Sequence, residues 1–225
     1  NDEVHVFGQV GIDLIAGPTE ILVIADETAD PYLVALDLLG QAEHGPDSPA
    51  ILVTLSREFG QAVLAEVPRC LDAMPTRSVA EQAWRDYGEV VVASSREEAA
   101  ELADLYAPEH LEVQTADPDW FLHRLRNYGT LFLGPEATVA YSDKIIGTNH
   151  ILPTARAARY TGGLWVGKFI KTVTYQRLTQ EASAAVAPAA SAICRAEGMI
   201  GHAMTAEIRL ARYAQHPKQT SASSS

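Results

Sequence analysis

A glutamine and a histidine lie three residues apart near the end of an expected helix, in the stretch QAEHGPDSPAILVT. Side chains at positions i and i+3 share one helix face, so the Gln41 carbonyl oxygen and a His44 ring nitrogen can bind the same metal ion. The same spacing is also typical of a solvated or capping pair. Asp143 and His202 are further candidate ligands, although neither has a local pattern of its own. A site with nitrogen and oxygen donors and no cysteine would suit Zn²⁺, with a position left open for water or a substrate oxygen.

Two further segments carry histidines that could transfer protons. Glu109 and His110 are adjacent, in a segment expected to be a loop directly after a helix. A carboxylate and an imidazole side by side could divide two proton transfers between them; the alternative is a surface-exposed pair. In GTNHILP, residues 147–149 predict a backbone turn that holds His150 toward a site.

The apolar pattern predicts an α/β fold. Continuous apolar runs at 21–24, 50–55 and 89–94 are typical of strands buried on both faces of a parallel sheet, and HLEVQ and TLFLG predict two more strands. The first helix is expected to begin at Asp30–Pro31 and to end at Gly45–Pro46, which places its last turn at the strand edge where α/β folds bind ligands.

Other helices are expected at 56–67, 95–106 and 117–129, each with a capping residue at its start. From 136 to 171 the periodicity fades into a long irregular segment, which is typical of a functional region. Residues 172–213 are Ala-rich and predict helix, with Pro188 forcing a break or kink and small side chains suited to close packing at a subunit interface.

Composition limits the classes of function. The chain has 225 residues, 47% of them hydrophobic, and a formal net charge of −12, which argues against a nucleic-acid partner. No apolar run approaches the roughly 20 residues that cross a bilayer, and no leader pattern is present. Cys70 and Cys194 are far apart, which predicts neither a disulfide framework nor a thiolate zinc site and fits a reducing cytoplasm. No dinucleotide fingerprint or P-loop occurs.

Six segments together resemble the histidinol dehydrogenase family in order and spacing: AGPTEILVIAD, DLLGQAEHGPDSPAILVT, YAPEHLEV, GTLFLG, GTNHILPT and EGMIGH. The resemblance extends from Gly11 to Tyr213, and family members are longer on the amino-terminal side. The chain therefore looks like the C-terminal half, without the part that supplies most NAD contacts in that family. The resemblance implies a Rossmann-like parallel sheet with flanking helices and a C-terminal helical dimerisation segment.

The resemblance also implies site residues. The implied zinc ligands are Gln41, His44, Asp143 and His202, the last from the other subunit of a homodimer. The implied acid/base pair is Glu109 and His110, and the implied substrate contacts are His150, Glu197 and Thr19, where a serine is usual. In the implied reaction zinc holds the alcohol oxygen, His110 accepts its proton and hydride passes to NAD. Glu109 then activates water on the aldehyde, and a second hydride transfer gives a carboxylate.

The chain departs from the histidinol enzymes around Asp143, where YSDK replaces the usual Gly-Asp-Tyr. The basic stretch that follows contains four cations: Arg156, Arg159, Lys168 and Lys171. Because guanidinium groups bind sulfonate, phosphate or carboxylate oxygens, this resembles the family branch that includes the sulfopropanediol 3-dehydrogenases. The alternative is that these cations pair with surface carboxylates.

We therefore expect a zinc- and NAD-dependent cytoplasmic dehydrogenase that oxidises a small anionic or polar alcohol, with 2,3-dihydroxypropane-1-sulfonate preferred over L-histidinol, the alternative substrate. A second alternative is a non-catalytic zinc-binding dimerisation fragment. The expected divisions are the end of a nucleotide-binding domain at 1–20, an α/β domain at 21–163, a helical dimerisation region at 164–213 and a disordered tail at 214–225.

Overall fold

The computed structural model describes residues 5, 8 and 10–213, in two compact units that divide between Ile170 and Lys171. The tail at 214–225, which we expected to be disordered, lies outside the described residues. The first unit contains the whole sheet, and the second contains two packed helices. No helix in the described part of the chain is long and apolar enough to cross a membrane.

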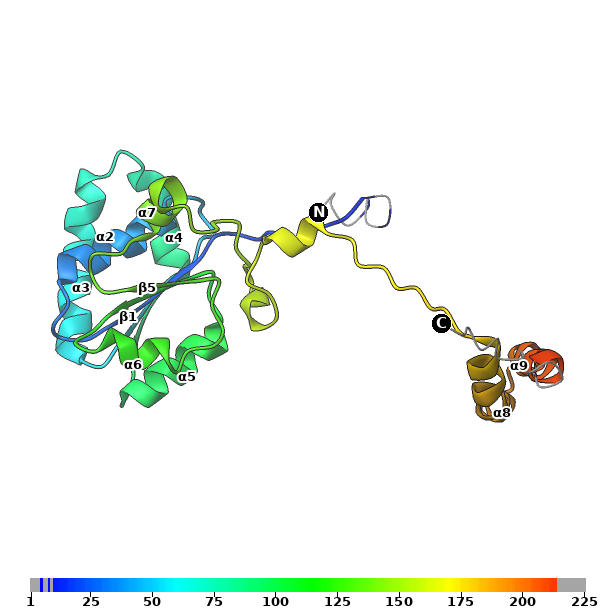
Figure 1. Cartoon of the computed structure of the whole chain (residues 1–225). Helices are drawn as coiled ribbons and strands as arrows, with labels where there is room; N and C mark the ends of the chain where they lie inside the picture. Colours follow the sequence, from blue (N-terminus) through cyan, green and yellow to red (C-terminus); the bar gives the residue numbers. More distant parts are fainter. Residues whose placement is uncertain (1–4, 6–7, 9, 214–225) are drawn as a thin grey trace, which may run out of the picture. The chain divides into compact units, whose positions relative to one another are not determined.

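The first unit is built on a five-stranded parallel sheet, as the sequence predicts (Figure 1). Its strands, in the spatial order β3-β2-β1-β4-β5, are β1 (Ile21–Ala25), β2 (Ala50–Thr54), β3 (Gly88–Val92), β4 (His110–Gln114) and β5 (Thr130–Leu133). β1, β2 and β4 are buried along their whole length because helices cover both faces of the sheet.

Helices cover the two faces in separate layers (Figure 1). One layer contains α2 (Pro31–Ala42), α3 (Arg57–Ala73) and α4 (Arg77–Tyr87), and the other contains α5 (Arg96–Tyr106) and α6 (Pro118–Leu122). Alternate residues of each strand face opposite layers, so that Ile21 and Val23 pack toward α2 while Leu22 and Ile24 pack toward α5.

The predicted helix starts are confirmed by their caps. Four side chains each accept a hydrogen bond from a backbone N–H in the first turn, over 2.8 to 3.3 Å: Asp30, Ser56, Ser95 and Asp117. The Glu98 carboxylate accepts from the N–H of Ser94, completing a reciprocal cap one residue earlier than a standard capping box.

Two helix predictions in the first unit are wrong about where the helix ends. α3 continues through Pro68 to Ala73, because the apolar face that includes Val63 and Leu71 remains buried and outweighs one lost hydrogen bond. α6 ends at Leu122, well before Gly129, because the Asp104 carboxylate accepts the N–H groups at 126 and 127 and holds that segment as a loop. Sequence analysis missed α4 altogether.

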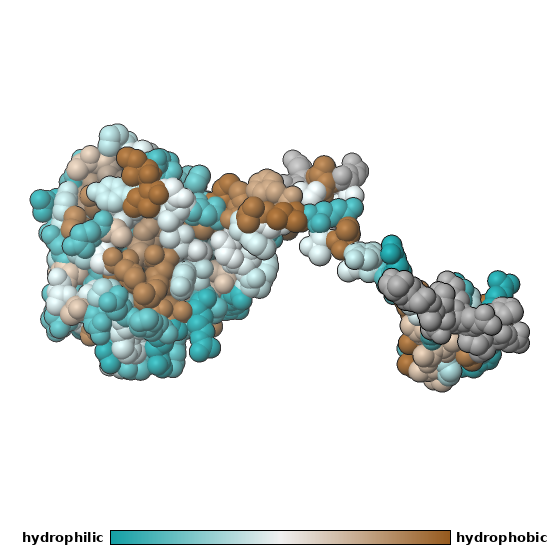
Figure 2. Space-filling view, viewed as in Figure 1, coloured by the Kyte–Doolittle hydropathy of each residue, from teal (hydrophilic) through white to brown (hydrophobic). Residues whose placement is uncertain are grey.

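Residues 136–171 are largely irregular, as expected. They contain only short turns: α7 (Val139–Tyr141), the π-helical turn η1 (Ser142–Ile146), and the 3-10 turns η2 (Ala157–Arg159) and η3 (Val166–Phe169). Large apolar side chains are exposed along the end of this segment (Figure 2), among them Trp165, Val166, Phe169 and Ile170.

The second unit corrects the prediction for 172–213. Helix begins only at Gln180, after a stretch rich in β-branched residues, and the Thr179 hydroxyl caps it. α8 (Gln180–Ala196) continues through Pro188, so of the expected break or kink the break does not occur. The chain turns at Gly198, which has a left-handed φ of +76°, before α9 (Ile200–Tyr213).

The connection β1-α2-β2 determines where the candidate ligands lie. The β1 and β2 strands are parallel, so the α2 crossover returns toward the amino ends of the strands. Gln41 and His44, at its end, therefore lie near the start of β1 and β4. Sites of open α/β sheets usually lie at the carboxyl ends of the strands, so the placement expected from that rule is wrong.

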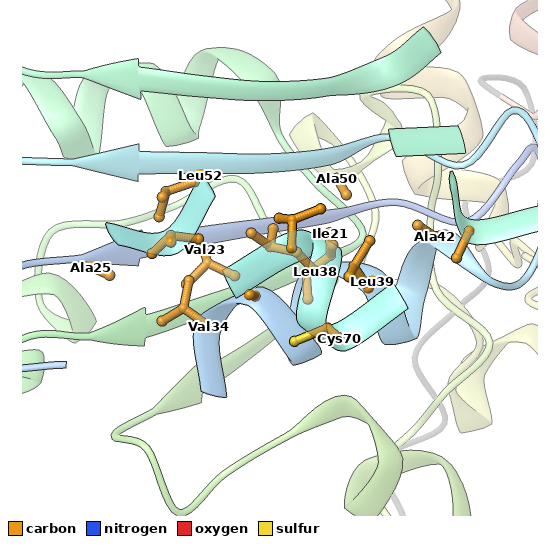
Figure 3. Close-up of a cluster of buried hydrophobic side chains, with 14 of the residues drawn as sticks. Ile21, Val23, Ala25, Val34, Leu38, Leu39, Ala42, Ala50, Leu52 and Cys70 are labelled. Atoms are coloured by element: carbon orange, nitrogen blue, oxygen red, sulfur yellow. The ribbon is translucent and has the colours of Figure 1, made fainter. Parts of the chain in front are cut away.

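The packing of α2 on the sheet gives a direct test of the fold. Leu38 is fully buried in the cluster of Figure 3, whereas Leu36, on the same helix, is 37% exposed. We expect Leu38→Ala to lower the free energy of unfolding by about 2 to 5 kcal/mol, because it leaves a cavity. We expect Leu36→Ala to change it by about 0.5 kcal/mol or less. Urea unfolding measures both, and equal losses in the two variants would contradict this packing.

Candidate active site

Glu109 and His110 form a buried pair at the start of β4, only 7% and 3% exposed, so the surface-exposed alternative is wrong. Glu109 Oε2 accepts a hydrogen bond from Thr19 Oγ1 over 2.5 Å and another from the Glu20 N–H over 3.1 Å. Two donors on one oxygen hold this carboxylate in place. Its second oxygen is left for other contacts.

The His110 ring is oriented by a backbone carbonyl. His110 Nδ1 lies 3.0 Å from the Glu20 carbonyl oxygen, which can only accept, so Nδ1 carries the proton. In the neutral ring Nε2 is then the unprotonated nitrogen, which can act as a base. Glu20 therefore holds both members of the pair through its backbone, with its N–H on Glu109 and its carbonyl on His110.

A chain of hydrogen bonds fixes the orientation of the Gln41 amide. Thr19 donates its only hydroxyl proton to Glu109, so it must accept from Gln41 Nε2, which contacts it. The network thus assigns the nitrogen of the amide to the Thr19 side and leaves Oε1 available as a ligand. Gln41 is itself buried, at 3% exposure.

His44 is oriented in the manner common for metal-binding histidines. Its Nδ1 lies 3.2 Å from the backbone carbonyl oxygen of Gln41, which requires a proton on Nδ1 and leaves Nε2 free to bind a metal ion. The two side chains predicted from their spacing therefore each present one free donor atom, an oxygen from Gln41 and a nitrogen from His44.

Gln41, His44 and Asp143 line one cavity of about 640 Å³ between α2 and residues 135–144. The structure thus brings three of the four predicted zinc ligands to one cavity; the fourth, His202, is expected from the other subunit. Within the described residues no three His, Cys, Asp or Glu side chains form a group that could hold a metal ion, and the predicted set consists of two such residues and an amide. The nitrogen and oxygen donors nevertheless fit Zn²⁺.

Glu20 is a site residue that sequence analysis missed. Burial, and next the charge of Glu109, raise the pKa of its carboxyl from 4.5 to about 7. Its Oε1 is buried without a hydrogen-bond partner among the described residues. The residue follows Thr19, but nothing in its sequence context distinguishes it from a solvated glutamate.

Residues 147–150 are irregular rather than a regular turn, and His150 is exposed there. Gly147 adopts a left-handed φ of +84°, and the Asn149 side chain accepts from the N–H of Ile151 over 3.0 Å. The following segment returns to the site, where Thr154 Oγ1 accepts from the Gly17 N–H over 2.7 Å.

Arg156 and Arg159 are exposed near the end of α5. Arg159 donates to the Leu105 carbonyl oxygen over 2.7 Å, and Arg156 is close enough to Tyr106 for an electrostatic interaction with its hydroxyl group. Among the described residues, no carboxylate forms an ion pair with either arginine, or with Lys168. The cations are thus available to an anion, although Arg159 also ties its segment to α5.

Glu197 and His202 belong to the second unit and are exposed there. Glu197 ends α8, and His202 lies in the first turn of α9. The first unit therefore contains three candidate zinc ligands and the acid/base pair. The roles of Glu197 and His202 at the site stay predictions.

Comparisons with known proteins identify the family of the chain. The family model described as Histidinol dehydrogenase matches residues 3–210. In Ruegeria pomeroyi, the sulfopropanediol 3-dehydrogenase is 54% identical and the histidinol dehydrogenase 46% identical, each over 92% of this chain and 48% of its own length. The crystal structure of histidinol dehydrogenase from Elizabethkingia anophelis matches with a TM-score of 0.82 and 37% identity, over 95% of this chain and 49% of that one. The chain spans about half the length of the curated relatives at the top of the comparison.

The Glu20 carboxyl makes stability depend on pH. Its folded-state pKa is raised to about 7 from 4.5, so protonation favours the folded state below about pH 4.5, and this contribution is lost as pH rises through about 7. Glu20→Gln cannot ionise. We therefore expect the melting temperature of this variant, compared with that of the wild type, to be higher at pH 8 than at pH 5.5. Calorimetry at both values measures the shift. The exposed Glu27→Gln variant is the control, and an equal response in both variants would contradict the assignment.

Proposed function

Because the chain belongs to the histidinol dehydrogenase family, we propose that the protein is an NAD-linked dehydrogenase that oxidises a primary alcohol through an aldehyde to a carboxylate. The observation that carries this proposal is the buried Glu109–His110 pair, joined through Thr19 to Gln41 at the cavity that His44 also lines. The activity is proposed for the complete enzyme, since this chain corresponds to about half of its relatives.

The acid/base pair divides the proton transfers. His110 Nε2, left free by the Nδ1 contact to the Glu20 carbonyl, accepts the proton of the substrate hydroxyl. Glu109, whose Oε2 atom is fixed by two donors, accepts a proton from the water that adds to the aldehyde. Thr19 is hydrogen-bonded to both Glu109 and Gln41. It therefore fixes the position of the proton acceptor relative to the candidate zinc ligand at the end of α2.

Zinc would be held by Gln41, His44 and Asp143 together with His202 of the partner subunit. When bound, Zn²⁺ supplies Lewis-acid polarisation of the alcohol oxygen. NAD is the hydride acceptor in the proposed reaction, but this chain has no dinucleotide fingerprint, so no contact to NAD is assigned to it.

We propose an anionic substrate, 2,3-dihydroxypropane-1-sulfonate, ahead of L-histidinol. Two observations favour it: the higher identity to the sulfopropanediol enzyme of R. pomeroyi than to its histidinol enzyme, and the cations of residues 156–168 that lack carboxylate partners in the described chain. Arg156 is the stronger candidate because Arg159 already donates to a backbone carbonyl.

We also propose a cytoplasmic homodimer in which each site takes residues from both subunits. Glu197 and His202 are exposed on the second unit, which makes them accessible to another chain. The exposed apolar side chains at 165–170 give a surface suited to burial against a partner. The two cysteines are free, which fits a reducing compartment.

An assay of the protein from its complete reading frame tests the substrate. We expect NADH to form with 2,3-dihydroxypropane-1-sulfonate in the presence of Zn²⁺. We expect Arg156→Ala to raise KM for this substrate by about tenfold or more with kcat kept, because a charge-assisted hydrogen bond contributes about 1.5 to 3 kcal/mol. Steady-state kinetics measure both constants.

Two variants serve as controls. Arg57→Ala removes an exposed arginine at the start of α3 and is expected to leave both constants unchanged. His110→Asn is expected to lower kcat by about 10² to 10⁴ by removing the base. Turnover of L-histidinol alone would overturn the sulfonate proposal. Zinc binding without NADH from either substrate would favour the non-catalytic alternative.

A further inference from the structure

A second set of polar side chains lies beside the candidate site and has no part in the proposed reaction. It consists of Asp37 on α2 and of Glu112 and Gln114 on β4. Glu112 and Gln114 are fully buried, and Asp37 is half-buried and lines the same cavity. Asp37 lies one helical turn before Gln41, and Glu112 lies two residues after His110 on the same face of the strand. The surroundings are otherwise apolar, since Val34, Leu38 and Phe132 belong to the core cluster there.

The three side chains are hydrogen-bonded to one another. Gln114 Nε2 donates to Asp37 Oδ2 over 2.9 Å and to Glu112 Oε2 over 3.2 Å. The Asp37 and Glu112 carboxyls lie close enough to interact, which favours a proton on one of them. Burial raises the pKa of both carboxyls, in agreement with a shared proton.

Stability alone does not explain this cluster. Glu112 Oε1 and Gln114 Oε1 are buried without hydrogen-bond partners in the described chain, and Glu112 is only 1% exposed. Burying unpartnered polar atoms costs stability, and apolar side chains of similar size would pack here at least as well. The cluster therefore needs another explanation, which its remaining contacts provide.

The remaining contacts lead to the segment that carries Asp143. Thr138 Oγ1 donates to Asp37 Oδ1 over 3.1 Å, and Glu112 is joined to Asp37 through the Gln114 amide, which donates to both carboxylates. Thr138 directly precedes α7, which leads into the η1 turn that contains Asp143.

Much of η1 is exposed, with Ile145 at 84% and Ile146 at 61%. Its position therefore depends on the preceding residues and on buried Ser142, whose hydroxyl is hydrogen-bonded to Thr148 over 2.6 Å.

We propose that Asp37 and Glu112 are positioning residues that hold residues 138–143 against α2 and β4, so that Asp143 lies at the same cavity as Gln41 and His44. This inference rests on the proposed function, because it explains how the third zinc ligand from this chain is placed. It also explains the spacing: α2 carries Gln41 and, one turn earlier, the group that holds the segment of Asp143. The packing of α2 on β4 thus fixes the position of Gln41 and His44 on one side of the cavity and of Asp143 on the other.

Thr138→Val and Glu112→Leu test the proposal in the full chain. Thr138→Val removes the hydroxyl that holds residues 138–143 to Asp37, and Glu112→Leu removes an acceptor of the Gln114 amide that holds Asp37 in turn. We expect zinc affinity to fall by about 10- to 100-fold in each variant, as for other groups that orient metal ligands. Competition with a chelating dye measures this affinity. Hydrogen exchange at residues 139–146 is expected to quicken in both variants, and urea unfolding shows whether each variant folds.

Two further variants separate positioning from a general structural effect. Glu112→Gln keeps the size and a donor toward Asp37 and is expected to restore wild-type affinity. Thr28→Val removes a matched hydroxyl-to-carboxylate hydrogen bond, to Asp26, and is expected to leave affinity and exchange unchanged. Folded Thr138→Val and Glu112→Leu variants with wild-type zinc affinity or wild-type exchange would overturn the proposal. A wild-type chain that binds no zinc would instead overturn the proposed metal site, and the exchange measurement would still decide the positioning role.

Discussion

The hydrogen-bond chain from Gln41 through Thr19 to Glu109 is the interaction on which the rest of the site depends. Thr19 has one proton to give, and giving it to Glu109 obliges it to accept from Gln41. This single constraint orients the amide for metal binding and holds the carboxylate as a proton acceptor. Glu20 completes the arrangement, because its backbone N–H and carbonyl fix Glu109 and His110. Candidate ligand and candidate base are thereby parts of one network.

The network lies at the amino ends of the strands, which is unusual for an open parallel sheet. The cause is the direction of α2, whose end returns to the start of β1 and β4 and brings Gln41 and His44 with it. A dinucleotide-type site would use the opposite edge and a glycine-rich turn that this chain lacks. Polar side chains then extend along the α2–β4 contact from Gln41 to Asp37, linking the site to the segment of Asp143. The same packing that forms the core therefore also builds the cavity.

Much of the fold could be predicted because its signals are local. Strands covered on both faces, such as β1 and β2, have continuous apolar sequences, and Asp30 or Ser95 mark helix starts through their caps. By contrast α4 is polar along most of its length, buries only two alanines and begins without a side-chain cap, so neither an apolar run nor a start signal marks it in the sequence. Gln41 and His44 could be found from spacing and resemblance. Glu20 and Glu112 could not, because their importance comes from tertiary burial, and a single carboxylate in a sequence looks like a solvated one.

The central claim is that Gln41, His44 and Asp143 surround one metal ion at the cavity beside the Glu109–His110 pair. X-ray absorption at the zinc edge, on the chain loaded with one equivalent of Zn²⁺, tests it most directly. The account predicts a shell of nitrogen and oxygen at about 2.0 to 2.2 Å with imidazole scattering that weakens in a His44→Ala variant. Sulfur scattering at about 2.3 Å, or no retained zinc, would contradict it.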